Sequence, residues 1–168
     1  SLFKDLKSIT EIRLSSNRLT QIDENLFDNL SSLYRLYLDN NRIFSIGPQL
    51  FKDLSRLMTL DLGSNNLTHI EDFTFSKLKS IDTLILNDNQ LRMITDKTFA
   101  NISSVSVDLR RNQLSNISEE AFSGILYLDY LRLSNNRLSM GLNFSRVAIQ
   151  GDLDLSYNSI KSATDISV

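Results

Sequence analysis

The stretch Leu57-Met58-Thr59-Leu60-Asp61-Leu62-Gly63-Ser64-Asn65-Asn66-Leu67 is the clearest copy of a pattern that recurs along the whole chain. With x for a variable residue, the pattern is L-x-x-L-x-L-x-x-N-x-L. Its asparagine recurs at Asn17, Asn41, Asn65, Asn89, Asn112, Asn136 and Asn158, which are 24, 24, 24, 23, 24 and 22 residues apart. A fixed period of this length is the sequence signature of a solenoid, in which each repeat packs against its neighbours.

The repeats begin near residues 9, 33, 57, 81, 105, 128 and 150, and they predict one solenoid domain over residues 1–168. Residues 1–8 match the tail of a preceding repeat, because Phe3-x-x-Leu6 corresponds to Phe27-x-x-Leu30. We therefore expect an interior piece of a longer array, without terminal caps.

Within each repeat, the L-x-L core alternates apolar and variable residues, which predicts a strand with one buried face. Stacked repeats would place these strands in a parallel sheet, with neighbours about 4.8 Å apart. The asparagine follows the strand, where its amide can bond backbone groups of its own and the adjacent turn. A phenylalanine recurs on the opposite wall, at Phe3, Phe27, Phe51, Phe75, Phe99, Phe122 and Phe144. We expect an α/β solenoid shaped as a horseshoe, with a parallel concave sheet and an irregular or 3₁₀ convex side.

This pattern resembles the leucine-rich repeat family, and the resemblance covers essentially the whole chain. The spacing of 24 residues with Phe-x-x-Leu is similar to the typical repeat class of Toll-like receptor ectodomains, Slit-like proteins and insect surface proteins such as chaoptin. Those proteins usually carry cysteine-rich caps, whereas this chain has no cysteine. The resemblance implies a recognition module, either of an innate-immune receptor or of an adhesion or guidance protein.

The composition gives little support to catalysis or metal binding. The net charge is −2, so the chain has no general attraction for nucleic acid or anionic lipid. The absence of cysteine excludes disulfides and thiolate metal sites. The single histidine, His69, accompanies no nucleophile or phosphate-binding motif, and pairs such as Glu119-Glu120 are typical of solvated surface. We predict no enzyme activity, no cofactor, no metal and no membrane span within this segment.

Five asparagines lie in N-x-S/T sequons, at variable positions of their repeats: Asn29, Asn66, Asn101, Asn116 and Asn143. Such sequons accept N-linked glycans in secreted proteins, so they favour an extracellular or cell-surface glycoprotein. The alternative is that asparagine and serine are simply turn residues in an asparagine-rich repeat.

Two clusters of variable residues on the concave face are the candidate binding sites. The first lies around Tyr37, Met58 and Ile85, with Tyr34 beside Tyr37 and Met58 and with Arg35 and Asp61 as further candidates. The second lies around Arg110, Arg111, Tyr130 and Arg132. Tyrosine and arginine dominate interface energetics, and apolar side chains exposed on a sheet need a reason. The alternative is that these are scattered surface residues.

Charges on this face should pair across strands, because residues in one column belong to adjacent strands in register. Glu11 should face Arg35, and Asp108, Arg132 and Asp154 should alternate in charge along one column. They either neutralise one another on a solvated sheet or await a charged partner.

Two places break the period and are expected to be irregular. One residue is missing between Ile102 and Leu109, so that Ser104 falls where a leucine belongs. After Asn136 the inward apolar position falls on Gly141, and Met140, Leu142 or Val147 would have to compensate.

The sequence thus predicts a non-enzymatic recognition module that binds a protein ligand or receptor through its concave face or flank. A cell-adhesion or guidance protein is the alternative, and a homodimer and a membrane anchor elsewhere in a longer chain stay open. Nucleic-acid or anionic-ligand binding is disfavoured, because Asp108 and Asp154 flank the basic cluster on the concave face.

Overall fold

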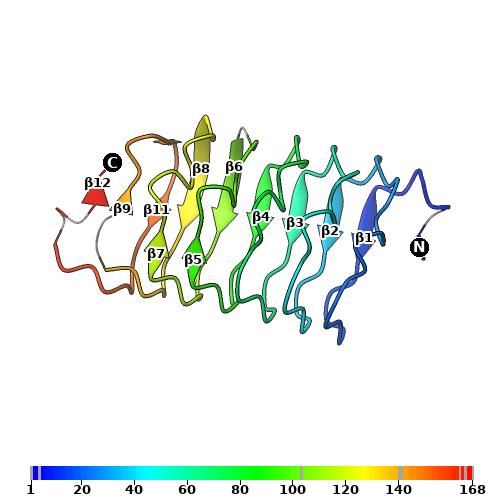
Figure 1. Cartoon of the computed structure of the whole chain (residues 1–168), viewed down its shortest axis with the longest axis horizontal. Coiled ribbons are helices and arrows are strands. Elements are labelled where there is room, and N and C mark those ends of the chain that lie inside the picture. Colours follow the sequence, from blue (N-terminus) through cyan, green and yellow to red (C-terminus); the bar gives the residue numbers. More distant parts are fainter. Residues whose placement is uncertain are drawn as a thin grey trace.

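The structure, a computed structural model, describes residues 2–3, 5–102, 104–139, 142–162, 164 and 166–167. Short parallel strands stand side by side in one row from the N-terminal to the C-terminal turn (Figure 1). The main sheet contains β1 (Glu11–Arg13), β2 (Arg35–Tyr37), β3 (Thr59–Asp61), β4 (Thr83–Ile85), β6 (Ser104–Asp108), β8 (Tyr127–Arg132), β10 (Ala148–Ile149) and β11 (Leu153–Asp154). Each strand pairs with the strand of the next repeat, except that β10 and β11 both pair with β8.

Two further pairs of strands are also parallel. They join β5 (Met93–Ile94) to β7 (Asn116–Ile117), and β9 (Leu142–Asn143) to β12 (Ile166–Ser167). The described residues form no α-helix. The convex wall is built instead from turns whose N–H groups bond the carbonyl three residues earlier, such as Leu30 to Phe27 (3.3 Å) and Leu54 to Phe51 (3.1 Å). The fold is the expected solenoid with a parallel sheet, and its convex side contains no α-helix among the described residues.

The core follows directly from the repeat. The middle residue of each regular strand is buried, as for Leu36, Leu60 and Leu84, whose relative exposure is 0%. The residues on either side of it face outward, so each strand buries one face and presents the other to solvent. The leucine following each strand is buried as well, as at Leu38 and Leu62.

Asparagine side chains form a continuous ladder beside the sheet. Asn65 donates to the carbonyl oxygens of Leu38, Leu62 and Gly63 at 3.0, 3.0 and 3.2 Å, and its Oδ1 accepts from the Ile43 N–H at 3.0 Å. Asn41, Asn89, Asn112, Asn136 and Asn158 repeat these four bonds at the equivalent positions. The ladder therefore satisfies buried backbone groups that the short strands leave unpaired.

The residue before each ladder asparagine has a left-handed backbone. Its φ angle is 52–58° in all seven repeats, at Ser16, Asn40, Ser64, Asp88, Arg111, Asn135 and Tyr157. This conformation is costly for most side chains and is best tolerated by asparagine and aspartate. The turn that positions the ladder thus keeps the same backbone conformation, whichever residue type precedes the asparagine.

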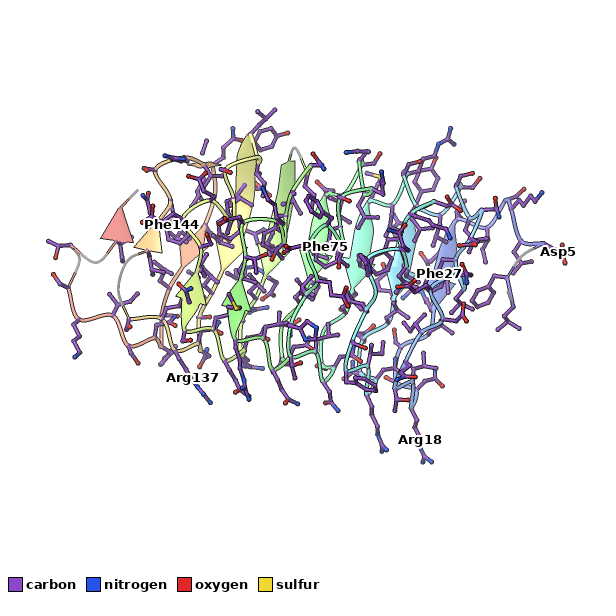
Figure 2. The ribbon with its side chains drawn as sticks, in the orientation of Figure 1. Asp5, Arg18, Phe27, Phe75, Arg137 and Phe144 are labelled. Atoms are coloured by element: carbon purple, nitrogen blue, oxygen red, sulfur yellow. The ribbon has the colours of Figure 1, made fainter. Side chains whose placement is uncertain are left out.

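Phenylalanine rings form a second spine through the interior (Figure 2). Rings are stacked at 5.3–6.3 Å between centroids for the pairs Phe3–Phe27, Phe51–Phe75, Phe75–Phe99 and Phe99–Phe122. Phe122 and Phe144 are also in contact, at 6.3 Å, but tilted by 36°. Phe27 and Phe51 are both buried and described, and no ring contact joins them.

The missing residue of the fifth repeat is absorbed within the sheet. Val105 pairs with Leu128 and Val107 with Leu131, so one residue of β6 lies opposite two residues of β8. This is a β-bulge, and it lets Val105, which is 3% exposed, occupy the buried position of the first leucine. The Ser104 side chain, Met140 and Gly141 lie outside the described residues. Leu142 beyond them is buried and Val147 is half-buried.

Candidate binding surface

The outward side chains of the sheet lie in register, because each strand pairs with its neighbour without a shift from β1 to β4. Glu11 faces Arg35, as the repeat predicts, with 3.6 Å between Arg35 Nη1 and Glu11 Oε2. Glu11 also accepts from Arg13 Nε at 2.6 Å. Both arginines are exposed and Glu11 is half-buried, so solvent screens these pairs and they contribute little to stability.

Tyr37 forms a cation–π contact with Arg13. The guanidinium carbon of Arg13 lies 4.4 Å from the centroid of the Tyr37 ring, and Tyr37 is half-buried. The contact orients the ring across the first two strands. The predicted residue Tyr37 thus belongs with Arg13 and Glu11 in the structure.

Met58 lies in a hollow that the sequence analysis did not anticipate. A depression of about 330 Å³ is lined by Thr10, Tyr34, Arg35, Met58, Thr59 and Asp82. Tyr34 and Met58 are 38% and 46% exposed. Of the residues predicted around Tyr37, Met58 and Ile85, this hollow contains Met58 and the neighbouring Arg35, and neither Tyr37 nor Ile85 lines it.

The hollow is formed by one further column of variable residues. Thr10, Tyr34, Met58 and Asp82 each follow the first leucine-type residue of their repeat. Their backbones are linked from strand to strand: Tyr34 N–H donates to Thr10 O (2.8 Å), and Met58 N–H donates to Tyr34 O (2.9 Å). The repeat pattern places these four residues in one column, to which the predicted residue Met58 belongs.

Asp61 and Ile85 are neighbours in the central column. Asp61 is half-buried, and its Oδ1 accepts from the Gly63 N–H at 2.9 Å. Burial raises the pKa of the Asp61 carboxyl, and the nearby charges of Asp39 and Asp108 act in the same direction. Ile85, half-buried, separates Asp61 from Asp108 along the column.

The second cluster is arranged differently from its prediction. Asp108 and Asp154 both lie opposite Arg132, so the alternating register is correct. Asp108, however, is buried and forms a two-pronged ion pair with Arg110, with Nε 2.9 Å from Oδ1 and Nη2 2.5 Å from Oδ2. Arg132 stacks instead over Tyr130, at 4.2 Å from the ring centroid. The expected ladder of cross-strand ion pairs is therefore replaced by two local pairs.

Two titratable groups of this cluster have shifted pKa values. Burial raises the pKa of Tyr130, with Arg132 opposing the shift. Asp154 accepts from the hydroxyl (2.6 Å) and the N–H (3.0 Å) of Ser156, and the hydroxyl bond is the largest cause of its lowered pKa. Arg111, predicted with this cluster, lies in the left-handed turn after β6 and pairs with Asp88 at 3.6 Å.

Most sequon asparagines are accessible. Asn29, Asn66, Asn101 and Asn116 are exposed, and Asn29 and Asn101 have left-handed φ angles of 64° and 66°. Asn143 is half-buried, and its Oδ1 accepts from the Ser145 N–H at 3.0 Å and from its hydroxyl at 2.6 Å.

No residue cluster indicates catalysis or metal chemistry in the part of the chain that the structure describes. His69 is exposed, and its Nδ1 lies 3.1 Å from the Thr68 hydroxyl. Within residues 2–167 apart from the gaps given above, no group of three His, Asp or Glu side chains could hold a metal. The same residues contain no helix with the length and apolar character to cross a membrane.

Comparison with known proteins identifies the repeat. The family described as "Leucine rich repeat" matches residues 1–43, 31–91 and 80–138. The chain belongs to the leucine-rich repeat family. A search of curated protein sequences finds no match.

Solved leucine-rich repeat structures share the fold over nearly the whole chain. Drosophila Toll, in its complex with Spatzle, is 25% identical with a TM-score of 0.82, over 95% of this chain and 23% of Toll. The APL1 leucine-rich repeat domain is 24% identical with a TM-score of 0.79, over 95% of this chain and 41% of that one. The LRIM1/APL1C complex gives 19% identity and a TM-score of 0.73, over 96% and 33%. This leucine-rich repeat chain thus spans well under half of each of these proteins.

Proposed function

We propose that this leucine-rich repeat chain is a non-enzymatic recognition module that binds a protein ligand through its concave sheet face, as part of an innate-immune receptor type of protein. The hollow beside Tyr34 and Met58 carries the proposal. Two large apolar side chains are exposed there next to Arg35 and Asp82. Exposed apolar surface rimmed by charged groups is typical of protein interfaces.

The comparisons support a protein as the ligand. The similar region of Toll comes from a structure of Toll with Spatzle, and APL1C was solved in complex with LRIM1. Both of these relatives assemble with proteins, so a protein partner is the simplest expectation for this chain.

A photo-crosslinking amino acid at position 34 would identify the partner, with the same group at exposed Lys97 on the convex side as the matched control. The purified partner would then be titrated against Tyr34→Ala and Met58→Ala. Each should weaken binding by at least about tenfold, which is typical of an interface hot spot, and Lys97→Ala by less than about twofold. Equal affinities for all variants would overturn the concave-face site.

We further propose that the chain is exposed to the extracellular or cell-surface environment and is glycosylated. Four exposed sequon asparagines support this. Protein secreted from a glycosylating host should lose apparent mass on enzymatic deglycosylation. Asn29→Gln and Asn101→Gln should each remove one glycan, whereas Asn143→Gln should have the least effect because its amide is bonded to Ser145. An unchanged mobility of the secreted wild type would refute glycosylation.

A further inference from the structure

A row of arginines runs along the flank that follows the asparagine ladder. We define the arginine flank as Arg18, Arg42, Arg92, Arg111 and Arg137, which lie in the windows 16–21, 40–45, 64–69, 88–93, 111–116 and 135–139. These windows contain one acidic residue, Asp88. A chain of net charge −2 therefore carries a local excess of four positive charges on one flank.

The backbone places these windows in register. Arg42 N–H donates to Leu19 O at 2.8 Å, and Arg137 N–H donates to Leu114 O at 2.8 Å. The turns between them follow the same pattern, through Asn66 to Ile43 (2.9 Å), Gln90 to Leu67 (2.8 Å) and Gln113 to Leu91 (2.9 Å). Figure 2 shows Arg18 and Arg137 projecting from the same lower edge of the solenoid, away from Phe27 and Phe75.

The arginines are available to a ligand. All five are exposed, and only Arg111 has an acidic partner among the described residues, Asp88 at 3.6 Å. Opposite charge is concentrated elsewhere, on the convex segments that carry Asp23, Glu24, Glu71, Asp72, Asp96, Glu119 and Glu120. The convex segments mix these acidic residues with Lys52, Lys77, Lys79 and Lys97, whereas the windows of the arginine flank contain one acidic residue.

The length and spacing of the flank fit a polymer. Five intervals between adjacent turns span about 24 Å, and adjacent turns are about 4.8 Å apart, less than the screening length of about 8 Å at physiological salt. The fields of arginines in adjacent turns therefore add along the flank. The window 64–69 carries no arginine, so Arg42 and Arg92 lie two turns apart. No enclosed cavity is formed there among the described residues, since none of the hollows is lined by these arginines.

The uncharged side chains favour a polysaccharide over a nucleic acid. Apart from Phe44 and Met93, the exposed residues between the arginines are hydroxyls, amides and one imidazole, such as Thr68, Gln90 and Ser115. Hydroxyls and amides bond sugar hydroxyls, whereas single-stranded nucleic acids are held by rows of stacking aromatics. Arginine forks also match the paired oxygens of a sulfate group.

We propose that the arginine flank binds an extended sulfated polysaccharide, along the solenoid and independently of the concave-face site. Asn66 and Asn116 are sequons within the same windows, so a glycan on either would occupy part of this surface. The experiment therefore uses protein expressed without glycosylation.

The test measures binding to size-defined heparin oligosaccharides between about 50 and 300 mM salt. Five contacts should give a log–log slope of about −3.5, on the scale of about −0.7 per contact for a flexible polyanion. The variant R18Q/R42Q/R92Q/R137Q should bind at least about tenfold more weakly at 150 mM salt, with a slope of about −0.7. The charge-matched control K52Q/K77Q/K79Q/K97Q, which lies on the convex segments, should retain wild-type affinity within about twofold.

Circular dichroism checks that the variants stay folded, which we expect because the substituted side chains are exposed, apart from Lys52, which is half-buried and pairs with Asp28. Absence of heparin binding by the wild type, or equal loss in the control, would overturn the proposal. Tighter binding of a single-stranded oligonucleotide or of polyglutamate than of heparin would also overturn it, in favour of a nucleic acid or an acidic protein. Loss of heparin binding in Y34A/M58A would show that the flank is not an independent site.

Discussion

The two spines that run through the solenoid differ in how strictly they are built. Each ladder asparagine from Asn41 to Asn158 makes the same four bonds, even across the β-bulge of the fifth repeat. The phenylalanine spine is broken between Phe27 and Phe51 and tilted at its last junction. Hydrogen bonds require a narrow geometry, whereas dispersion contacts between rings tolerate rotation and gaps. The amides therefore fix the register of the turns, and the rings fill the volume between them.

The largest expected effect tests the ring spine. Phe75→Ala should lower the free energy of unfolding by about 4 kcal/mol, since Phe75 is fully buried and stacks on rings at both sides. Phe27→Ala should cost about 1 kcal/mol less, because Phe27 is equally buried but stacks only on Phe3. Equilibrium unfolding in urea measures both, and equal losses would mean that ring stacking adds nothing beyond burial.

The ladder should show a sharper dependence on position. Asn89→Ala should cost about 3 kcal/mol, because it leaves the buried Leu67 N–H without a partner and removes one of the two amide bonds to the Leu62 carbonyl. Asn17→Ala should cost about 1 kcal/mol or less, because Asn17 is exposed and bonds only Leu14 and Ser15 of its own turn. The same urea measurement applies, and a large loss at Asn17 would contradict the view that bonds between turns carry the stability.

A smaller effect tests the turn that positions the ladder. Tyr157 has a left-handed φ of 54° and is 81% exposed, so its bulky side chain gains little there. Tyr157→Asn should raise the unfolding free energy by about 1 kcal/mol, since asparagine tolerates this conformation. Tyr157→Ala is the matched control and should gain less, because alanine has no such preference. Thermal unfolding of the three proteins decides the order.

The smallest expected effect on stability concerns Asp61, a charged residue of the sheet between the two spines. The pKa of Asp61 is raised mainly by burial, so the folded state binds more protons than the unfolded state between the ordinary and the raised pKa. Stability therefore falls as the pH rises through that window and stays lower above it. Asp61→Asn keeps an acceptor for the Gly63 N–H and should be slightly more stable than the wild type at pH 7. The difference should vanish at about pH 3, below the ordinary range of aspartate. A difference independent of pH would contradict this cause.

The repeat alone was sufficient for the architecture. The alternation of apolar and variable residues in L-x-L, together with the regularly spaced asparagine, predicted the parallel sheet. It also predicted the pairing of Glu11 with Arg35, because the register of strands in a solenoid follows from the repeat period. The helix-free convex side also followed from the absence of a 3.6-residue period. The Ser104 irregularity was located correctly, and the bulge that lets Val105 fill the buried position required the structure.

The binding surface was less predictable, for two physical reasons. Side-chain partners depend on rotamers, so Arg132 stacks on Tyr130 although the register places Asp108 beside it. The backbone conformation also decides where a strand ends. Arg111 has a left-handed φ angle and belongs to the turn after β6, so it does not continue the strand. The repeat pattern indicated that Met58 is exposed, but the shape of the hollow around it depends on side-chain packing that a pattern does not give. A net charge of −2 likewise does not show where the charges lie.

The ladder bonds all reach in one direction. Each asparagine beyond the first donates to and accepts from the turn before it: Asn41 serves Leu14 and Leu19, and Asn158 serves Leu133 and Leu138. Through the ladder, a turn therefore obtains side-chain partners for its backbone from its successor, whereas its own N–H groups also donate to the backbone of its predecessor, as Arg42 does to Leu19. A ribosome releases the chain from its N-terminus. Each newly emerged turn therefore supplies the asparagine that bonds backbone groups of the turn released before it, so these groups become paired as the polypeptide grows. Loss of a turn from the C-terminal side would leave a backbone N–H such as that of Leu19 without its asparagine acceptor, whereas loss from the N-terminal side would leave an N–H such as that of Arg42 without its carbonyl acceptor.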